Sequence, residues 1–224
     1  MGNLSRYRSL GDLPSVAPVF PLTGALLLPG THLPLNIFEP RYLAMIDAAL
    51  AGDRLIGMIQ PAHPGAETET ALPELSRVGC LGRLTSFSET GDGRYLISLT
   101  GILRFAVAAE VEAETPFRQV RMDFSTYAED LEPAEAVALD RDRFFQALTP
   151  YLEASELEVS WEDLGRARTE SLVNTLAVAL PLGAREKQGL LLAETLNQRA
   201  QLLLTLLEMA RGSDSDEPDG GSLQ

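Results

Sequence analysis

The spacing of the apolar residues changes near residue 125, and this change constrains the fold more than any other feature of the chain. Before it, apolar stretches are short and separated by Gly and Pro, which is typical of strands and turns. After it, apolar residues recur every three or four positions, which is typical of helices packed on a core. The sequence therefore predicts an α+β chain in which a β-rich half is followed by a helical half.

Five apolar stretches of the first half are predicted strands. They cover residues 16–22, 55–59, 94–99, 102–107 and 120–124. The last of them alternates apolar and charged residues, as a half-buried strand does. Residues 89–94 predict a turn between two such stretches, because Gly91 and Gly93 can adopt a positive φ without steric cost.

One helix is predicted within the first half, over residues 39–52. Its apolar residues recur at the spacing of one helix face that lies on a core: Tyr42, Met45, Ile46, Ala49 and Leu50. Pro40 suits the first helical turn, where its missing N–H breaks no bond, and Gly52 suits the C-terminal exit.

The second half predicts a bundle of further helices. The first covers residues 133–154, with Pro150 kinking or ending it. Its apolar side consists of Val137, Phe144, Phe145, Leu148 and Leu152. The second opens with a capping box at Ser160 and Asp163 and stops at Pro181. Its predicted inward side consists of Leu164, Ala167, Ser171, Leu172, Thr175, Leu176 and Ala179. Residues 184–211 form one broken helix or two successive ones.

These patterns divide the chain into three parts. Residues 1–128 form the β-rich subdomain and residues 129–211 the helical bundle. Residues 212–224 lack any apolar period and are expected to be a disordered acidic tail.

The charge balance excludes two classes of partner. The 224 residues carry 32 acids and 18 bases, a net charge of −14, and most of the excess lies after residue 125. A chain this acidic repels the phosphates of nucleic acids. It repels anionic membrane surfaces for the same reason. We therefore expect neither nucleic acid nor a membrane as a partner.

The N-terminus and the cysteine content point to the cytoplasm. Residues 1–18 lack the apolar core of a signal peptide, and no apolar run approaches the roughly 20 residues that span a bilayer. Cys80 is the only cysteine, so neither an internal disulfide nor a thiolate zinc site can form.

A single lysine removes two enzyme classes. A P-loop needs a lysine after a glycine-rich loop, whereas Lys187 stands between Glu186 and Gln188. A Ser–Lys dyad needs a desolvated lysine. Lys187 lies at a polar helix start, so we expect it at the surface. The acids at residues 153–163 are interpreted as a solvated helix surface. No catalytic, metal-ligating or cofactor-binding residue is predicted.

One catalytic alternative stays open at this point. Cys80 or a serine could act as the nucleophile of a small hydrolase with His32 or His63, since such partners meet only in space. Residues 78–82 are typical of a strand, however, and a free cysteine there is most often a buried small hydrophobe.

The most distinctive stretch is residues 27–42, which ends in the string Ile-Phe-Glu-Pro-Arg-Tyr. A turn at Pro29 and Gly30, a strand end and a helix start explain much of it. These features do not explain Glu39 and Arg41. Charged residues beside a buried stripe usually make a specific ion pair or a hydrogen bond to the backbone.

At these residues the sequence resembles the LON substrate-binding domain, the N-terminal domain of Lon proteases, which also occurs as a stand-alone protein. The resemblance covers residues 17–210 and is carried first by residues 20–22, 28–30, 33–35 and 37–42. Later matches follow in order: Gly57, Val78-Gly79, residues 92–95, Gly101 with Arg104 and Phe105, Lys187-Gln188, Leu190-Leu191 and Arg199.

The resemblance implies a PUA-like, partly closed β-barrel with one docked helix, followed by a C-terminal α-helical bundle. It implies a non-catalytic module that captures unfolded or degron-bearing polypeptides, without the ATPase and Ser–Lys protease parts of Lon. Lon protease or another proteolytic machine is then an implied partner. Polypeptide would bind in a groove on the β-rich half, at its junction with the bundle, or along a free sheet edge.

Six residues of the family motifs are the candidate site. They are Phe38, Glu39, Arg41, Tyr42, Arg94 and Arg104. Each either holds the fold together or contacts a bound peptide, and we expect the structural role for the charged ones.

Overall fold

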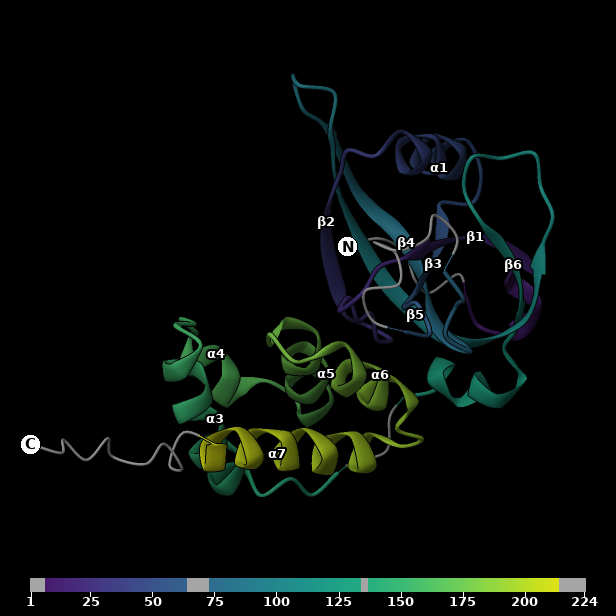
Figure 1. Cartoon of the computed structure of the whole chain (residues 1–224). Coiled ribbons are helices and arrows are strands. Elements are labelled where there is room, and N and C mark those ends of the chain that lie inside the picture. The colour runs from purple at the N-terminus through teal and green to yellow at the C-terminus, as the bar shows by residue number, and fades with distance from the viewer. Residues whose placement is uncertain (1–6, 64–72, 134–136, 214–224) are drawn as a thin grey trace, which may run out of the picture. The chain divides into compact units, whose positions relative to one another are not determined.

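A computed structural model describes residues 7–63, 73–133 and 137–213, and these residues form two compact units (Figure 1). The first unit comprises residues 1–134 and 174–192, and the second comprises residues 135–173 and 193–224. Residues 174–192 thus belong with the strands, although their helical period groups them with the second half of the sequence. The predicted tail lies outside the described residues, apart from residues 212–213 at the end of the last helix.

A six-stranded sheet is the frame of the first unit. Its strands are β1 (Val16–Pro21), β2 (His32–Ile37), β3 (Leu55–Ile59), β4 (Val78–Glu89), β5 (Tyr95–Val111) and β6 (Gln119–Asp123). Their order is β2-β5-β4-β3-β1-β6, and β5 also pairs with β6. All strand pairs are antiparallel except β1 with β3. Five strands therefore pair in a closed circuit, and β2 lies beside β5 as an edge strand.

The strand β5 joins two of the predicted strands into one. Residues 94–99 and 102–107 were expected as separate strands, but β5 runs through both without a break. Gly101 lies at the point where they meet, and an added Cβ there would overlap the carbonyl oxygen of Leu28. A glycine is therefore needed at this position because two backbones approach closely, and not because the chain turns.

The predicted helix of the first half is confirmed as α1 (Pro40–Ala51). Four of its five predicted core residues, Tyr42, Met45, Ile46 and Ala49, are buried. The ring of Tyr42 lies 4.2 Å from that of Phe20 on β1, which anchors the helix to the sheet.

The core of the circuit packs around Phe105, which is fully buried on β5. Gly57 and Gly79 face its ring: a Cβ added to either would lie within 3.0 Å of the ring atom Cζ. Any side chain at these two positions would displace the aromatic ring, because interiors are close-packed. Two short 3-10 helices complete this part, η2 (Leu10–Asp12) and η3 (Ser125–Leu131).

Helix α6 (Ala184–Leu192) is tied to the sheet by two glutamines of the first unit. The side-chain amide of Gln60 donates to the Ala184 carbonyl at 3.0 Å and to Gln188 Oε1 at 3.2 Å. Gln188 in turn donates to the carbonyl of Val78 on β4. The family string Lys187-Gln188 therefore has a packing role.

The prediction that Lys187 lies at the surface is wrong. Only 8% of the residue is exposed, and its Nζ donates to the Val178 carbonyl at 3.2 Å. The carbonyl belongs to the last turn of α5 (Thr169–Ala179), where carbonyls lack partners within the helix and attract a cation. Burial lowers the pKa of the Lys187 ammonium.

The second unit contains α3 (Arg141–Ala154), α4 (Trp161–Arg166) and α7 (Leu196–Ser213). Helix α3 starts at Arg141, because Asp140 caps it by accepting from the Arg143 amide. Residues 134–136 of the predicted helix lie outside the described residues. Val137 lies outside the helix, and Pro150 lies inside without ending it. Proline has no amide hydrogen, so at Pro150 the helix lacks only the hydrogen bond to the carbonyl four residues earlier.

The helix predicted between Ser160 and Pro181 is two helices, because Ala167 adopts an extended conformation between α4 and α5. Leu172 and Leu176 are buried as predicted, but the rest of the inward face is shifted. Ser171, Thr175 and Ala179 are exposed rather than buried, whereas Val173, Asn174 and Ala177 are buried. Ser160 is confirmed as the N-cap residue, since its Oγ accepts from the Asp163 amide. Residues 184–211 form two successive helices, α6 and α7.

Candidate functional site

The motif at residues 37–42 forms the corner between β2 and α1. Glu39 precedes the helix in an extended conformation, and its carbonyl accepts from the amides of Tyr42 and Leu43 at 2.9 Å each. Its carboxylate pairs with Arg41, with 3.0 Å from Nε and 2.9 Å from Nη2 to the same oxygen. The Arg41 guanidinium lies 4.5 Å from the ring centre of Tyr42. At this corner the Arg41 guanidinium therefore lies between the Glu39 carboxylate and the Tyr42 ring at the start of α1.

The pair of Glu39 and Arg41 holds the corner only weakly. The two side chains are 43% and 35% exposed. Ion pairs at this exposure contribute about 0–1 kcal/mol to stability. Tyr42 is the buried member, so the anchoring comes mainly from its ring.

Arg94 and Phe38 lie together because Ile37 pairs with Tyr95 in the sheet. The Arg94 guanidinium lies 5.8 Å from the ring centre of Phe38 and pairs with Asp92 at 3.0 Å. Phe38 itself is 62% exposed. Strand pairing therefore brings together two candidate residues that lie far apart in the sequence.

Two more exposed apolar side chains lie at the same end of the sheet. Leu96 pairs with Asn36 of β2, and Phe87 of β4 contacts the ring of Tyr95 at 4.9 Å. Leu96 is 47% and Phe87 39% exposed. Because side chains alternate between the two faces of a strand, Leu96 lies on the face of Asn36 and Phe38, whereas Phe87 lies on the other face with Tyr95. We call Phe38 and Leu96 the hairpin-end patch, since they lie toward the β4–β5 hairpin tip that projects beyond α1 (Figure 1).

Tyr95 connects this end of the sheet to α1. Its hydroxyl donates to Oδ1 of Asp47 at 3.1 Å. This hydrogen bond raises the pKa of the Tyr95 hydroxyl, because Asp47 accepts a proton that only the neutral phenol carries.

Arg104 is the one candidate residue that lies apart from the others, ten positions along β5 from Arg94. At the rise of a strand this separation is roughly 30 Å. Its guanidinium donates to both carboxylate oxygens of Asp130, at 2.9 and 2.7 Å, and to the Leu191 carbonyl at 3.1 Å. It also lies 4.7 Å from the ring centre of Tyr127. Arg104 thereby connects β5 to η3 and α6.

The Arg104–Asp130 pair is buried, with side chains 6% and 10% exposed. Burial by itself lowers the pKa of the Arg104 guanidinium, but the hydrogen bonds and charge of Asp130 raise it above its usual value. The role of Asp130 was not predicted, because it lies 26 residues after Arg104 and only the position of η3 brings the two together. Whether any of the six candidate residues contacts a ligand stays a prediction.

The structure does not support the hydrolase alternative. Cys80 lies fully buried on β4, so a substrate cannot reach its sulfur. His32 lies exposed on the edge strand, and its Nδ1 meets the hydroxyl of Thr100 at 2.9 Å. His63 is also exposed. Within residues 7–63, 73–133 and 137–213, no three His, Cys, Asp or Glu side chains are placed to hold a metal ion. No helix in this part of the chain is both long and apolar enough to cross a bilayer.

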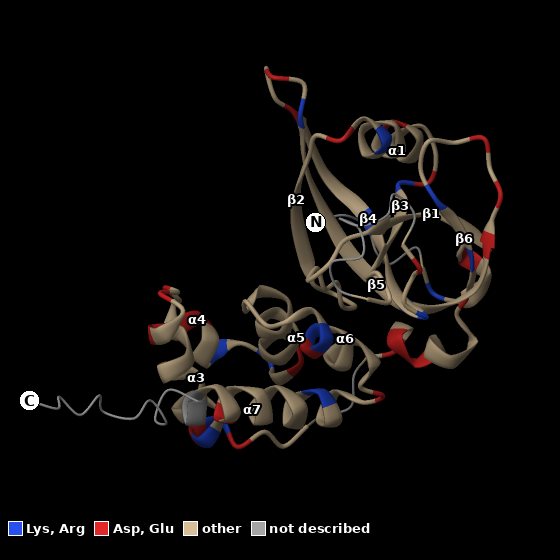
Figure 2. Cartoon of the chain, viewed as in Figure 1, with Lys and Arg blue, Asp and Glu red and all other residues tan. Residues whose placement is uncertain are grey.

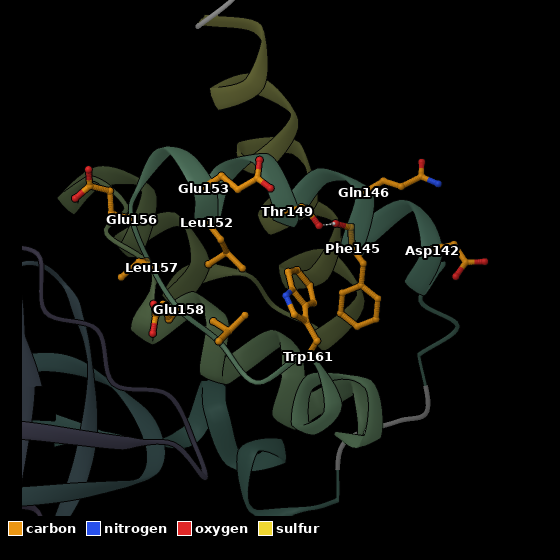
Figure 3. A pocket seen from close by; sticks show the side chains of 11 residues that line it. Asp142, Phe145, Gln146, Thr149, Leu152, Glu153, Glu156, Leu157, Glu158 and Trp161 are labelled. Carbon is orange, nitrogen blue, oxygen red and sulfur yellow. Dashed lines mark hydrogen bonds between the residues drawn. The ribbon is translucent and has the colours of Figure 1, made fainter.

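A groove of about 1150 Å³ opens on α3 in the second unit (Figure 3). Its apolar lining consists of Phe145, Leu152, Leu157, Val159 and Trp161. Its acidic lining consists of Asp142, Glu153, Glu156 and Glu158. The rings of Phe145 and Trp161 meet edge to face at 6.1 Å. We call this the α3 groove.

The sequence carries a signal for this groove that a helical period does not reveal. From Glu156 to Trp161 acidic or polar residues alternate with apolar ones, which is typical of an extended, half-buried segment. The acids were interpreted as a solvated helix face, but residues 155–160 are not helical.

Comparison with known proteins identifies the family. Residues 16–209 match the family model of the ATP-dependent protease La (LON) substrate-binding domain. The chain belongs to this LON substrate-binding domain family. The resemblance inferred from residues 37–42 and the later motifs is therefore confirmed.

Relatives and solved structures agree with this assignment. The chain is 26% identical to Lon protease 2 of Myxococcus xanthus over 205 residues, covering 89% of this chain and 24% of that protein. It is 28% identical to Lon protease 4 of Sorangium cellulosum over 208 residues, covering 92% and 25%. The chain thus spans about a quarter of the length of these relatives.

Two solved structures share the fold. A Lon N-terminal domain protein from Xanthomonas campestris matches with a TM-score of 0.59 and 22% identity, covering 86% of this chain and 98% of that one. The N-terminal domain of a Mycobacterium avium complex Lon protease matches with a TM-score of 0.59 and 20% identity, covering 90% and 99%. The chain therefore shares its mixed α/β fold with these two Lon N-terminal domains.

Proposed function

We propose that this chain is a non-catalytic module that binds unfolded or degron-bearing polypeptides. The observation that carries the proposal is the hairpin-end patch. Its two apolar side chains are exposed at the same end of the sheet: Leu96 lies on β5, and Phe38 follows β2 within the family's most specific motif. Exposed apolar groups that gather at one place mark interaction sites, because covering them removes apolar surface from water.

The open edge of β2 adds a second means of holding an extended chain. The Gly101 amide donates to the Thr31 carbonyl, and outward and inward backbone groups alternate along a strand. The backbone groups of His32, Pro34 and Asn36 then face the open edge. Pro34 removes no ladder bond there, since its missing N–H points away from β5. A bound segment could pair with this edge while its apolar side chains cover the patch.

The family assignment supports the wider role. Lon protease 2 of Myxococcus xanthus and the other relatives are Lon proteases, so the proposed partners are polypeptide substrates and Lon or another proteolytic machine. In this role the chain recognises and does not cleave. The PUA-like barrel, the bundle and the cytoplasmic location remain predictions alongside it.

Two variants matched in residue and exposure test the proposal. Leu96→Ser removes an apolar group from the patch, and Leu192→Ser removes one at the end of α6; both leucines are 47% exposed. A reduced, carboxymethylated protein serves as the unfolded client, and the same protein in its native form as the comparison. Losing the apolar contact of Leu96 should weaken binding of the unfolded client about fivefold, equivalent to about 1 kcal/mol.

Leu192→Ser should leave that affinity unchanged, and the native client should bind at least tenfold more weakly than the unfolded one (about 1.4 kcal/mol). Equal binding of native and unfolded clients would refute polypeptide capture. Equal affinities for the two variants would refute the patch as its location.

A further inference from the structure

The α3 groove differs from the hairpin-end patch in one chemical respect, because its apolar floor is surrounded by carboxylates. Asp142, Glu153, Glu156 and Glu158 are all exposed, and Figure 3 shows Asp142 at the Phe145 end of the groove and Glu156 and Glu158 at the Leu157 end. The groove lining contains no Lys or Arg.

The nearby cations are already engaged. Arg141 lies 5.4 Å from the ring centre of Phe145 but donates to the carbonyls of Leu164, Gly165 and Ala167 at the end of α4. Arg143 pairs with Glu208 on α7, and Arg166 pairs with Glu162. Among the described residues, none of the four groove carboxylates forms an ion pair. Figure 2 shows the acidic segments beside α4.

The backbone adds negative potential to the same place. Helix α3 ends at Ala154, so the negative end of its dipole lies next to Glu153 and Glu156. The carbonyls of Tyr151, Leu152 and Glu153 in its last turn accept from the amides of Ser155, Leu157 and Glu156. Glu156 has a φ of 53°, a left-handed conformation that glycine usually occupies after a helix. This turn brings Leu157 and Val159 into the groove lining.

The apolar floor is exposed enough to bind something. Trp161, the only tryptophan of the chain, is 46% exposed, and Leu157 is 39% exposed. An aromatic floor with an acidic rim suits a ligand that is both apolar and cationic. Apolar side chains cover such a floor, whereas Arg and Lys pair with the rim and stack on tryptophan.

We propose that the α3 groove binds polypeptide segments in which apolar side chains alternate with Arg or Lys. Asp142 and Glu153 are eleven residues apart on α3, or roughly 16 Å, which matches about five residues of an extended chain. The proposal rests on polypeptide binding as the function, but it concerns a separate surface from the hairpin-end patch and gives it a distinct selectivity.

Trp161 supplies the readout, since its fluorescence reports directly on the groove. Three synthetic peptides of about ten residues are titrated. In the first, Arg alternates with Leu and Phe; in the second, Glu replaces Arg; in the third, Ser replaces Leu and Phe. The first peptide should shift the Trp161 emission and bind at least about tenfold more tightly than the other two. Raising the salt from about 50 mM to about 500 mM should weaken it several-fold, because screening acts on exposed charges.

Two variants with the same change of charge locate the site. Glu156→Gln with Glu158→Gln removes two rim charges, and Glu112→Gln with Glu114→Gln removes two exposed charges from the first unit. At about 0.5 kcal/mol for each rim charge, the first variant should lose about fivefold in affinity for the Arg peptide. The second should lose none.

Three outcomes would overturn the proposal: equal binding of the Arg and Glu peptides, equal effects of the two double variants, or equal binding of the Ser-containing peptide. None of them touches the capture of unfolded clients at the hairpin-end patch. That function fails instead when the Leu96→Ser and native-client tests fail.

Discussion

Replacing Arg104 with alanine should be among the most damaging single changes to this protein. The side chain donates two hydrogen bonds to Asp130 and one to the Leu191 carbonyl, and its backbone amide donates to Asp130 at 2.9 Å. Arg104→Ala leaves the Asp130 carboxylate buried without its cation. Breaking a buried pair in this way costs about 3–5 kcal/mol.

The assay is urea or thermal unfolding followed by circular dichroism. For a chain of this size, a loss of about 3–5 kcal/mol lowers Tm by about 6–20 °C. The matched control is Arg94→Ala, because Arg94 pairs with Asp92 at 3.0 Å but with side chains 51% and 60% exposed. That pair should contribute no more than about 1 kcal/mol.

A double-mutant cycle separates the pair from its surroundings. Arg104→Ala with Asp130→Ala removes both charges, so the double variant should be less destabilised than the sum of the single ones, with a coupling of about 1–3 kcal/mol. If Arg104→Ala cost no more than Arg94→Ala, the conclusion that Arg104 is a buried structural link between β5, η3 and α6 would be wrong.

Two further predictions concern packing and pH. Gly101→Ala should destabilise the protein by about 1–3 kcal/mol in urea unfolding, because the new methyl group overlaps the Leu28 carbonyl. The control Gly91→Ala should be neutral, since its methyl group meets no atom within 4 Å. A neutral Gly101→Ala would contradict the close approach of the two backbones. The hydrogen bonds from Arg118 lower the pKa of the Glu110 carboxyl, so their contribution is present above its usual pKa of 4.5 and fades as the pH falls through the lowered value. Glu110→Gln should therefore cost up to about 1 kcal/mol at neutral pH and less at about pH 3.5, and a pH-independent cost would exclude this pair as its origin.

Much of the fold could be predicted because its signals are local. The apolar spacing of residues 39–52 determined α1 and its buried face, and the shorter apolar stretches located the strands. The specific string at residues 37–42 identified the family. Each of these signals depends on residues that lie within a few positions of one another, and such spacing can be read directly from the sequence.

Predictions failed where the outcome depended on a partner far along the chain. Lys187 was expected at the surface from its polar neighbours, but the end of α5 covers it and its ammonium satisfies the carbonyl of Val178. The helix expected from Ser160 to Pro181 is broken at Ala167, so part of its predicted inward face is shifted as well. A single helical period cannot record a break that tertiary packing imposes.

The candidate sites divide in the same way. The sequence by itself determined the family, the corner residues Glu39 and Arg41, and the absence of a P-loop from a chain with one lysine. Only the tertiary structure decided that Arg94 contacts Phe38 and that Arg104 pairs with Asp130. It also decided that Trp161 lines a groove with an acidic rim. Strand register and helix packing bring these groups together across many residues, and such contacts depend on the whole fold because no local pattern encodes them.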